Sequence, residues 1–288
     1  GYTVQASIET WRTHDRPLAP GERDSAYGMI GSPEPVIETA DTVVPERGGR
    51  IVWHHRNTSS IWSPTLKLQG LEKFAARSAD PLLHRTFGGA IVGPRSRSIA
   101  VHLLTAQTAT LEEWLRRLDR QIAAVKDRPD AHRKWWNDFW QRSWIRASGS
   151  PEAEAASRGY ALQRFISACA GRGAYPIKFN GSIFNVDSRE PKESFDADYR
   201  RWGGPYWFQN TRLAYWPMLA SGDYEMMEPL FRMYLDALAL AEERTRMYFG
   251  HEGAFFPETM YFWGAYANDN YGWDRRGRHV SYVQNTYI

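Results

Sequence analysis

The residues best suited to chemistry stand in three short stretches of the second half of the sequence. These stretches are 178–182 (KFNGS), 198–217 (DYRRWGGPYWFQNTRLAYWP) and 251–259 (HEGAFFPET). Each of them places amides or carboxylates beside aromatic side chains. A sugar ring needs such a mixture, because its C–H face stacks on an aromatic ring while its hydroxyls need fixed hydrogen-bond donors and acceptors. The stretches therefore predict a carbohydrate site, with an aromatic packing interface holding buried ion pairs as the alternative.

Two carboxylates are candidates for catalysis. Hydrolysis of a glycosidic bond requires a carboxylic acid that protonates the leaving oxygen and a second group that activates water or attacks the sugar. Glu258 follows two Phe and a Pro, so we predict dry surroundings that favour its protonated form. Glu252, beside His251, is the second candidate for the acid. An Arg-paired structural role is the alternative for Glu258.

The substrate-binding candidates are the polar and aromatic residues around these carboxylates. We expect them to line one site at the same end of a helical domain, because sites are commonly built from separate loops on a rigid scaffold. They are Asn180, Asp198, Arg200, Trp202, Trp207, Asn210, Arg212, His251, Trp273 and Asp274. No spacing typical of metal ligands is found, and we expect neither a metal nor a cofactor.

The composition is that of a globular chain with many aromatic residues. Of the 288 residues 42% are hydrophobic and 24% charged, and 13 are Trp. The net charge of +3 is spread along the chain, which does not indicate a nucleic-acid partner. No apolar run is long enough to predict a membrane span. The one cysteine, Cys169, lies in an apolar helical pattern and is expected to be a small core residue.

The first part of the chain, 1–109, has the pattern of strands. The segments TVQASIETWR, RIVWHHRN and SIAVHLLTAQT alternate apolar and polar residues, and Gly- and Pro-rich turns separate them. We therefore predict part of an antiparallel β-sandwich. Four histidines are scattered over these strands without metal-ligand spacing and are interpreted as structural: His54, His55, His84 and His102.

Helical patterns begin after this region. Thr110 with Glu113 three residues later predicts a capped helix start, and Pro129 predicts a second start. We assign 110–150 to linker helices, whose aromatic stripe of Trp135, Trp136, Phe139, Trp140 and Trp144 is expected to be a buried docking face. From Pro151 to the end, 151–288, helices alternate with long loops, and Asp223 is expected to cap one of these helices.

The order of sandwich, aromatic linker helix and helical domain resembles enzymes with a β-sandwich followed by an (α/α)6 barrel. These include the glycoside hydrolases of family 95, which act on α-L-fucosides and α-L-galactosides, and the maltose-phosphorylase-like enzymes. The segment YWFQNTRLAYWPMLASGDYEMMEPLF carries the closest local likeness, through Tyr215-Trp216-Pro217 and Glu228-Pro229-Leu230-Phe231. The resemblance implies that 151–288 is the first half of an (α/α)6 barrel.

The resemblance also implies roles for two positions. Asn210 falls on the second of two asparagines that orient the attacking water in family 95, whereas Phe208 stands at the place of the first. Substrate identity therefore does not transfer. The region from DAHRKWW onward more closely resembles an uncharacterised bacterial domain family that is thought to be glycosidase-like and accompanies polysaccharide degradation.

The sequence thus predicts a glycosidase-like enzyme acting on an oligo- or polysaccharide, without nucleic-acid or membrane partners. A phosphorylase or polysaccharide lyase of the same fold and a non-catalytic carbohydrate-binding protein stay open as alternatives. A lyase would use His251, Arg200 and Arg212. The family likeness favours a periplasmic or secreted location. Because both ends stop within patterned segments, we expect the chain to be part of a longer protein, with a second catalytic carboxylate beyond Ile288.

Overall fold

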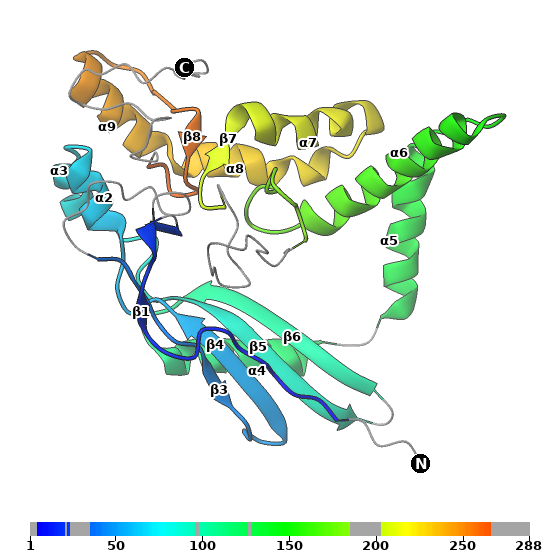
Figure 1. Ribbon diagram of the computed structural model, residues 1–288, viewed down its shortest axis with the longest axis horizontal. Helices are drawn as coiled ribbons and strands as arrows, with labels where there is room; N and C mark the ends of the chain where they lie inside the picture. The colour runs from blue at the N-terminus through cyan, green and yellow to red at the C-terminus, as the bar shows by residue number, and fades with distance from the viewer. Residues whose placement is uncertain are drawn as a thin grey trace. The chain divides into compact units, whose positions relative to one another are not determined.

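The computed structural model describes residues 5–20, 22–23, 35–95, 98–125, 128–184 and 203–265 (Figure 1). The chain divides into two compact units, which are described separately. The sheet unit comprises Gly1–Ala19, Ser32–Lys67 and Ala75–Asp127, and the helical unit comprises Pro20–Gly31, Leu68–Phe74 and Arg128–Ile288. Five predicted binding residues lie outside the described residues: Asp198, Arg200, Trp202, Trp273 and Asp274.

The sheet unit is built on one four-stranded antiparallel sheet. Its strands follow one another in the order β3-β4-β5-β6. They are β3 (Thr42–Val44), β4 (Arg50–Arg56), β5 (Arg85–Arg95) and β6 (Ser98–Gln107). A two-stranded sheet pairs β1 (Arg16–Pro17) with β2 (Ile37–Glu38). Two of the alternating segments, RIVWHHRN and SIAVHLLTAQT, therefore form antiparallel strands as predicted, whereas residues 5–12 of TVQASIETWR form no strand.

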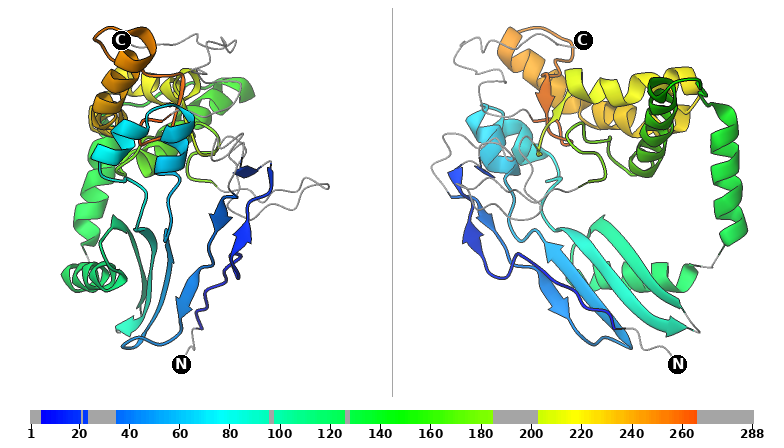
Figure 2. Two further views of the ribbon diagram at one scale, coloured as in Figure 1. Left: turned by 90° about the vertical axis from the view of Figure 1, so that its left-hand side faces the viewer. Right: turned by 45° about the vertical axis from the view of Figure 1, so that its right-hand side comes forward.

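Helix α4 (Leu111–Ala124) packs on one face of this sheet, as Figure 2 shows. Its residues Trp114, Leu118 and Ile122 form a core with Val52 and Ala90 of the strands. The cap predicted from the sequence is present, because Thr110 Oγ1 accepts a hydrogen bond from the backbone N–H of Glu113 at 3.2 Å. The carboxylate of Glu113 binds Arg117 one turn later, an exposed ion pair.

His54 lies in this core, beside Trp114. Its ring is 7% exposed and meets the indole edge-on, with 5.9 Å between the ring centroids. Burial lowers the pKa of His54 from its usual value, and the neighbouring His55 and Arg56 lower it further. The imidazole is therefore held in its neutral form, which supports a structural role.

The region predicted to contain strands also holds two short helices, α2 (Trp62–Leu68) and α3 (Glu72–Arg77). The prediction of mainly strands for 1–109 did not include these two helices. Leu66 and Leu71 are almost fully buried, and the backbone oxygen of Gln69 accepts a hydrogen bond from Tyr248 Oη at 2.7 Å. Residues 68–74 thus belong to the helical unit, although segments of the sheet unit flank them in the sequence.

The helical unit contains five helices of six or more residues after residue 128 and one short β-pair in its described part. Helix α6 begins at Pro151 as predicted, and Ser150 Oγ caps it through the backbone N–H of Ala153. Gly222 and Gly250 end two helices with φ of 73°. The five helices are α5 (Pro129–Arg142), α6 (Pro151–Ala170), α7 (Phe208–Ser221), α8 (Glu228–Asp236) and α9 (Leu238–Phe249).

The core of the helical unit is rich in methionine and aromatic side chains. Phe139 of α5 is almost fully buried in it, and Trp135, Trp136 and Trp140 pack against it from the same helix. The aromatic stripe of α5 is therefore a packing face, as predicted. Trp144, at 70% exposed, is not part of that face, because α5 ends at Arg142.

Asp223 does not cap a helix, contrary to the prediction. Its carboxylate is buried and accepts hydrogen bonds from Arg164 Nε at 3.1 Å, from Arg164 Nη2 at 2.9 Å and from Ser221 Oγ at 2.6 Å. Arg142 Nη2 lies 2.9 Å from the same carboxylate. The short 3-10 turn Tyr224–Met226 begins after it without a side-chain cap. Two arginines satisfy the Asp223 carboxylate in place of backbone N–H groups.

Candidate functional site

The short strands β7 (Tyr206–Trp207) and β8 (Thr259–Met260) bring two of the three chemistry-rich stretches together. They pair antiparallel, with Trp207 opposite Thr259. The backbone N–H of Phe208 extends this pairing by donating to the carbonyl oxygen of Glu258 at 3.0 Å. In Figure 1 the pair stands at the start of α7. The loop that carries Glu258 is thereby fixed to the first turn of α7.

Glu258 is buried at this junction. Its side chain is 7% exposed, and Oε1 accepts a hydrogen bond from the backbone N–H of Gln209 at 2.8 Å. Gln209 is in the first turn of α7, where backbone N–H groups have no partner within the helix. The carboxylate therefore serves as a cap delivered from a distant loop.

Lys178 joins the third stretch to the same place. Its ammonium group donates to the carbonyl oxygens of Gly204 at 3.1 Å and Pro205 at 2.7 Å. It also lies 4.1 Å from the centroid of the Tyr206 ring. The Lys178 cation thus forms a charge-assisted contact between the two loops, through the two carbonyl acceptors and the aromatic face.

Two buried phenols strengthen this junction. Tyr206 Oη donates to the carbonyl of Pro176 at 3.1 Å, and Tyr215 Oη accepts from the backbone N–H of Ile177 at 2.7 Å. Burial raises the pKa of Tyr215 to about 12 and raises that of Tyr206 as well. Both phenols stay protonated at neutral pH, so they tether the loop and are unsuited to act as a general base.

Asn180 lies in a strained turn beside Trp207. Phe179 approaches the indole of Trp207, with 6.4 Å between the ring centroids. Gly181 and Ser182 both have positive φ, of 117° and 53°, and the latter value is uncommon for a residue with a Cβ. Such strain persists only where surrounding contacts fix it, and it is concentrated at functional sites.

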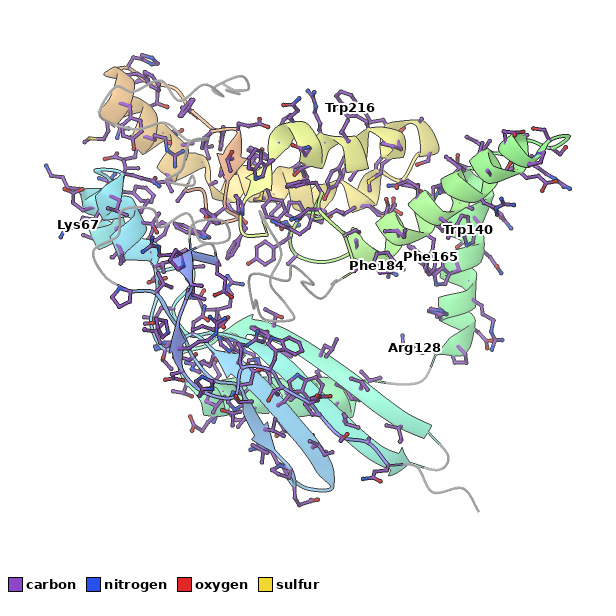
Figure 3. The ribbon with its side chains drawn as sticks, viewed as in Figure 1. Lys67, Arg128, Trp140, Phe165, Phe184 and Trp216 are labelled. Atoms are coloured by element: carbon purple, nitrogen blue, oxygen red, sulfur yellow. The ribbon has the colours of Figure 1, made fainter. Side chains whose placement is uncertain are left out.

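Asn210 and Arg212 lie in the first turns of α7, where Asn210 is exposed and Arg212 is half-buried. Among the described residues, the side chain of Asn210 makes no hydrogen bond and is exposed. The Arg212 guanidinium lies over the ring of Trp216, 4.7 Å from its centroid. Trp216 is 53% exposed and projects from α7 in Figure 3. Asn210 is thus the residue next to the Gln209 contact and is accessible from solvent.

His251 and Glu252 lie in the turn that follows α9. Both are exposed, and His251 Nδ1 lies 2.6 Å from the backbone oxygen of Glu252. The imidazole stacks on Phe249, with 5.9 Å between the ring centroids. Within the described part of the chain, no hydrogen bond or ion pair joins Glu252 to Glu258 or its partners. The structure therefore connects the segments of Asn180, Trp207 and Glu258 through contacts between their neighbouring residues. The turn that holds His251 and Glu252 is not part of these contacts.

The sequence interpretation missed two cations that hold the loops. Lys178 was within a recognised stretch but was not assigned a role. Arg244 is fully buried in α9 and donates to the carbonyl oxygens of Phe255 at 3.0 Å and Gly264 at 2.6 Å. It thereby fixes the loop that carries Glu258. Its signal in the sequence is an arginine on the apolar side of LALAEERTRMYF.

The described residues were compared with the requirements of a metal site and of a membrane-spanning helix. They contain no group of three or more His, Cys, Asp or Glu side chains placed to bind a metal ion. None of the helices that the structure describes is long and apolar enough to span a membrane.

The fold and the site define a two-unit protein with an antiparallel sheet, a helical unit and a buried carboxylate at a helix start. A family model described as Domain of unknown function (DUF5703), for the N-terminal part (DUF5703_N), matches residues 1–98 and 94–145. Because these matches cover just over half of the chain, the protein belongs to this family. Neither the curated proteins nor the solved structures include a match.

Proposed function

We propose that this protein is a glycoside hydrolase-like enzyme that cleaves an oligo- or polysaccharide by acid–base catalysis. The observation that carries the proposal is the buried Glu258 carboxylate, seated between the Trp207 strand and the start of α7. Glycoside hydrolysis needs a carboxylic acid held at a fixed position, and a buried carboxylate anchored by a backbone hydrogen bond supports this assignment.

In this proposal Glu258 is the general acid, and Asn210 orients the sugar or the attacking water. The exposed amide of Asn210 can both donate and accept, as a sugar hydroxyl requires. Glu252 is the alternative acid, and its exposure makes it the weaker candidate. Asn180, Trp207, Arg212 and His251 complete the proposed binding residues.

The same proposal includes a finer description of the fold. We take the helices α5–α9 as part of an (α/α)6 barrel and the four-stranded sheet as part of a β-sandwich. The antiparallel sheet and the packing of successive helices on one core support this proposal.

The test is a hydrolysis assay on the full chain with a panel of neutral and acidic oligosaccharides and a reducing-sugar readout. On a substrate that the wild type cleaves, Glu258→Gln is expected to lower turnover by about 100-fold or more, because an amide cannot donate the required proton. Glu228→Gln is the matched control, since Glu228 is an exposed surface residue paired with Arg232. Near-normal turnover of Glu258→Gln would remove Glu258 from the role of acid.

A non-catalytic carbohydrate-binding protein is the second candidate. It is favoured by one observation, that Glu258 Oε1 already serves as the acceptor for the Gln209 N–H. Binding of a saccharide, measured by calorimetry, without any cleavage would support this candidate.

The same panel also distinguishes the two other enzyme classes. Cleavage that depends on added phosphate would indicate a phosphorylase, and an unsaturated product that absorbs ultraviolet light would indicate a lyase.

A further inference from the structure

The ammonium group of Lys178 contacts three groups of the segment that runs into β7. It donates to two consecutive carbonyl oxygens, those of Gly204 and Pro205, and lies over the ring of Tyr206. These three residues lead directly into β7, whose second residue is Trp207. On its own side, Lys178 begins the turn that carries Asn180, and its backbone oxygen accepts from the N–H of Ser182 at 3.1 Å.

The turn that Lys178 begins has an uncommon backbone conformation. Gly181 adopts positive φ without penalty, whereas positive φ is unfavourable for Ser182 in an isolated chain. The Tyr206 and Tyr215 hydroxyls fix the segment before the turn, at Pro176 and Ile177. Lys178 is the residue that extends this attachment to the start of the strained turn itself.

We propose that Lys178 is a positioning residue that holds the Asn180 turn against the Trp207 strand and thereby sets the affinity for saccharide. This inference rests on the proposed function for its ligand, whereas the attachment of the two segments is a property of the free protein. If the Asn180 turn is not held in place, a smaller fraction of the molecules is competent to bind saccharide, and the apparent Kd rises by the inverse of that fraction.

The experiment compares Lys178→Met, Lys178→Arg and wild type in the full chain. Methionine keeps the length of the side chain and removes the charge and the donors, whereas arginine keeps both. Hydrogen exchange, measured by mass spectrometry without saccharide, follows the segments 178–184 and 203–208. We expect Lys178→Met to raise exchange in both segments together and Lys178→Arg to stay nearer to wild type.

The second measurement uses the saccharide that the wild type binds or cleaves best in the panel of oligosaccharides. We expect Lys178→Met to raise Kd or KM about tenfold, with kcat within about twofold of wild type. Arg142→Gln is the matched control for stability, because it removes a cation from the Asp223 ion pair, away from these segments. It should lower the midpoint of thermal unfolding without changing KM.

Three results would overturn the proposal. These are raised exchange confined to 178–184, a KM that Lys178→Met leaves unchanged, and an equal rise of KM in Arg142→Gln. If the wild type binds no saccharide of the panel, the proposed function fails and the affinity role falls with it. The exchange measurement then still decides the attachment, because it needs no ligand.

Discussion

The Glu258 carboxylate accepts a hydrogen bond from the backbone N–H of Gln209, a residue 49 positions earlier in the chain. This contact satisfies a helix N-terminus and fixes a buried carboxylate at the end of the β7–β8 pair at the same time. The stability and the chemistry of this position can therefore be separated by substitutions that keep or remove the acceptor oxygen.

Glu258→Ala should lower the free energy of unfolding by about 1–2 kcal/mol, because it leaves the Gln209 N–H without its cap. Glu258→Gln should lose less, since its amide oxygen still accepts. Urea denaturation measured by circular dichroism distinguishes the two. An equal loss in both variants would show that the charge, and not the acceptor, stabilises the helix start.

Asp223→Ala should lower the free energy of unfolding by about 3–5 kcal/mol. The substitution leaves the buried guanidinium of Arg164, 4% exposed, without its carboxylate partner. Asp138→Ala is the control, because Asp138 pairs with Lys134 on an exposed helix face and should change stability by less than about 1 kcal/mol. Similar urea midpoints for the two variants would contradict the role of the buried pair.

Tyr215 predicts a loss of stability at high pH. The unfolded phenol loses its proton near pH 10, whereas the buried phenol keeps it until about pH 12, so stability falls as pH rises through this window. Tyr215→Phe should flatten this decline but should cost about 1–3 kcal/mol at neutral pH, because the Ile177 N–H loses its acceptor. Urea midpoints at pH 7.5 and above pH 10 test both effects, with the exposed Tyr224→Phe as control.

His54 predicts a loss of stability at low pH. Its pKa in the folded state is below the ordinary value of 6.5, so the unfolded chain binds the proton first as pH falls. The stability is therefore fully present above pH 6.5 and decreases below it. His54→Phe should reduce the difference between melting temperatures at pH 7.5 and pH 5. A pH dependence equal to that of wild type would assign the effect to other groups.

Two glycines in helical surroundings should respond in opposite directions to alanine. Gly159 lies within α6, and an added Cβ meets nothing within 4 Å, so Gly159→Ala should stabilise by about 0.5–1 kcal/mol. Gly222 ends α7 with φ of 73°, and Gly222→Ala should destabilise by about 1 kcal/mol although space is available there. Shifts of the same sign in thermal unfolding would contradict this assignment.

Local signals in the sequence predicted much of the secondary structure. Thr110 marks a helix start through a cap contact three residues away, and Pro129 and Pro151 mark two more through the fixed φ of proline, all of which the sequence displays directly. The helices at 62–68 and 72–77 were missed because the surrounding strand pattern was extended across them.

Contacts between distant residues could not be predicted in this way. Asp223 resembles a helix cap, yet it pairs with Arg164, 59 residues away. The attachment of Glu258 to Gln209 and of Lys178 to Gly204 likewise depends on how the loops meet in space. The sequence therefore identified Glu258 as a candidate while giving no sign of the helix start that it caps.

The contact between Gln69 and Tyr248 has a consequence for the order of events during synthesis. The residues are 179 positions apart, so at 5–20 residues per second the ribosome adds Tyr248 roughly 9–36 s after Gln69. During that interval the segment around Leu71, which is 1% exposed in the native protein, lacks the α9 residue that its neighbour Gln69 contacts. The nascent chain thus presents an apolar segment to chaperones until its own C-terminal helices arrive.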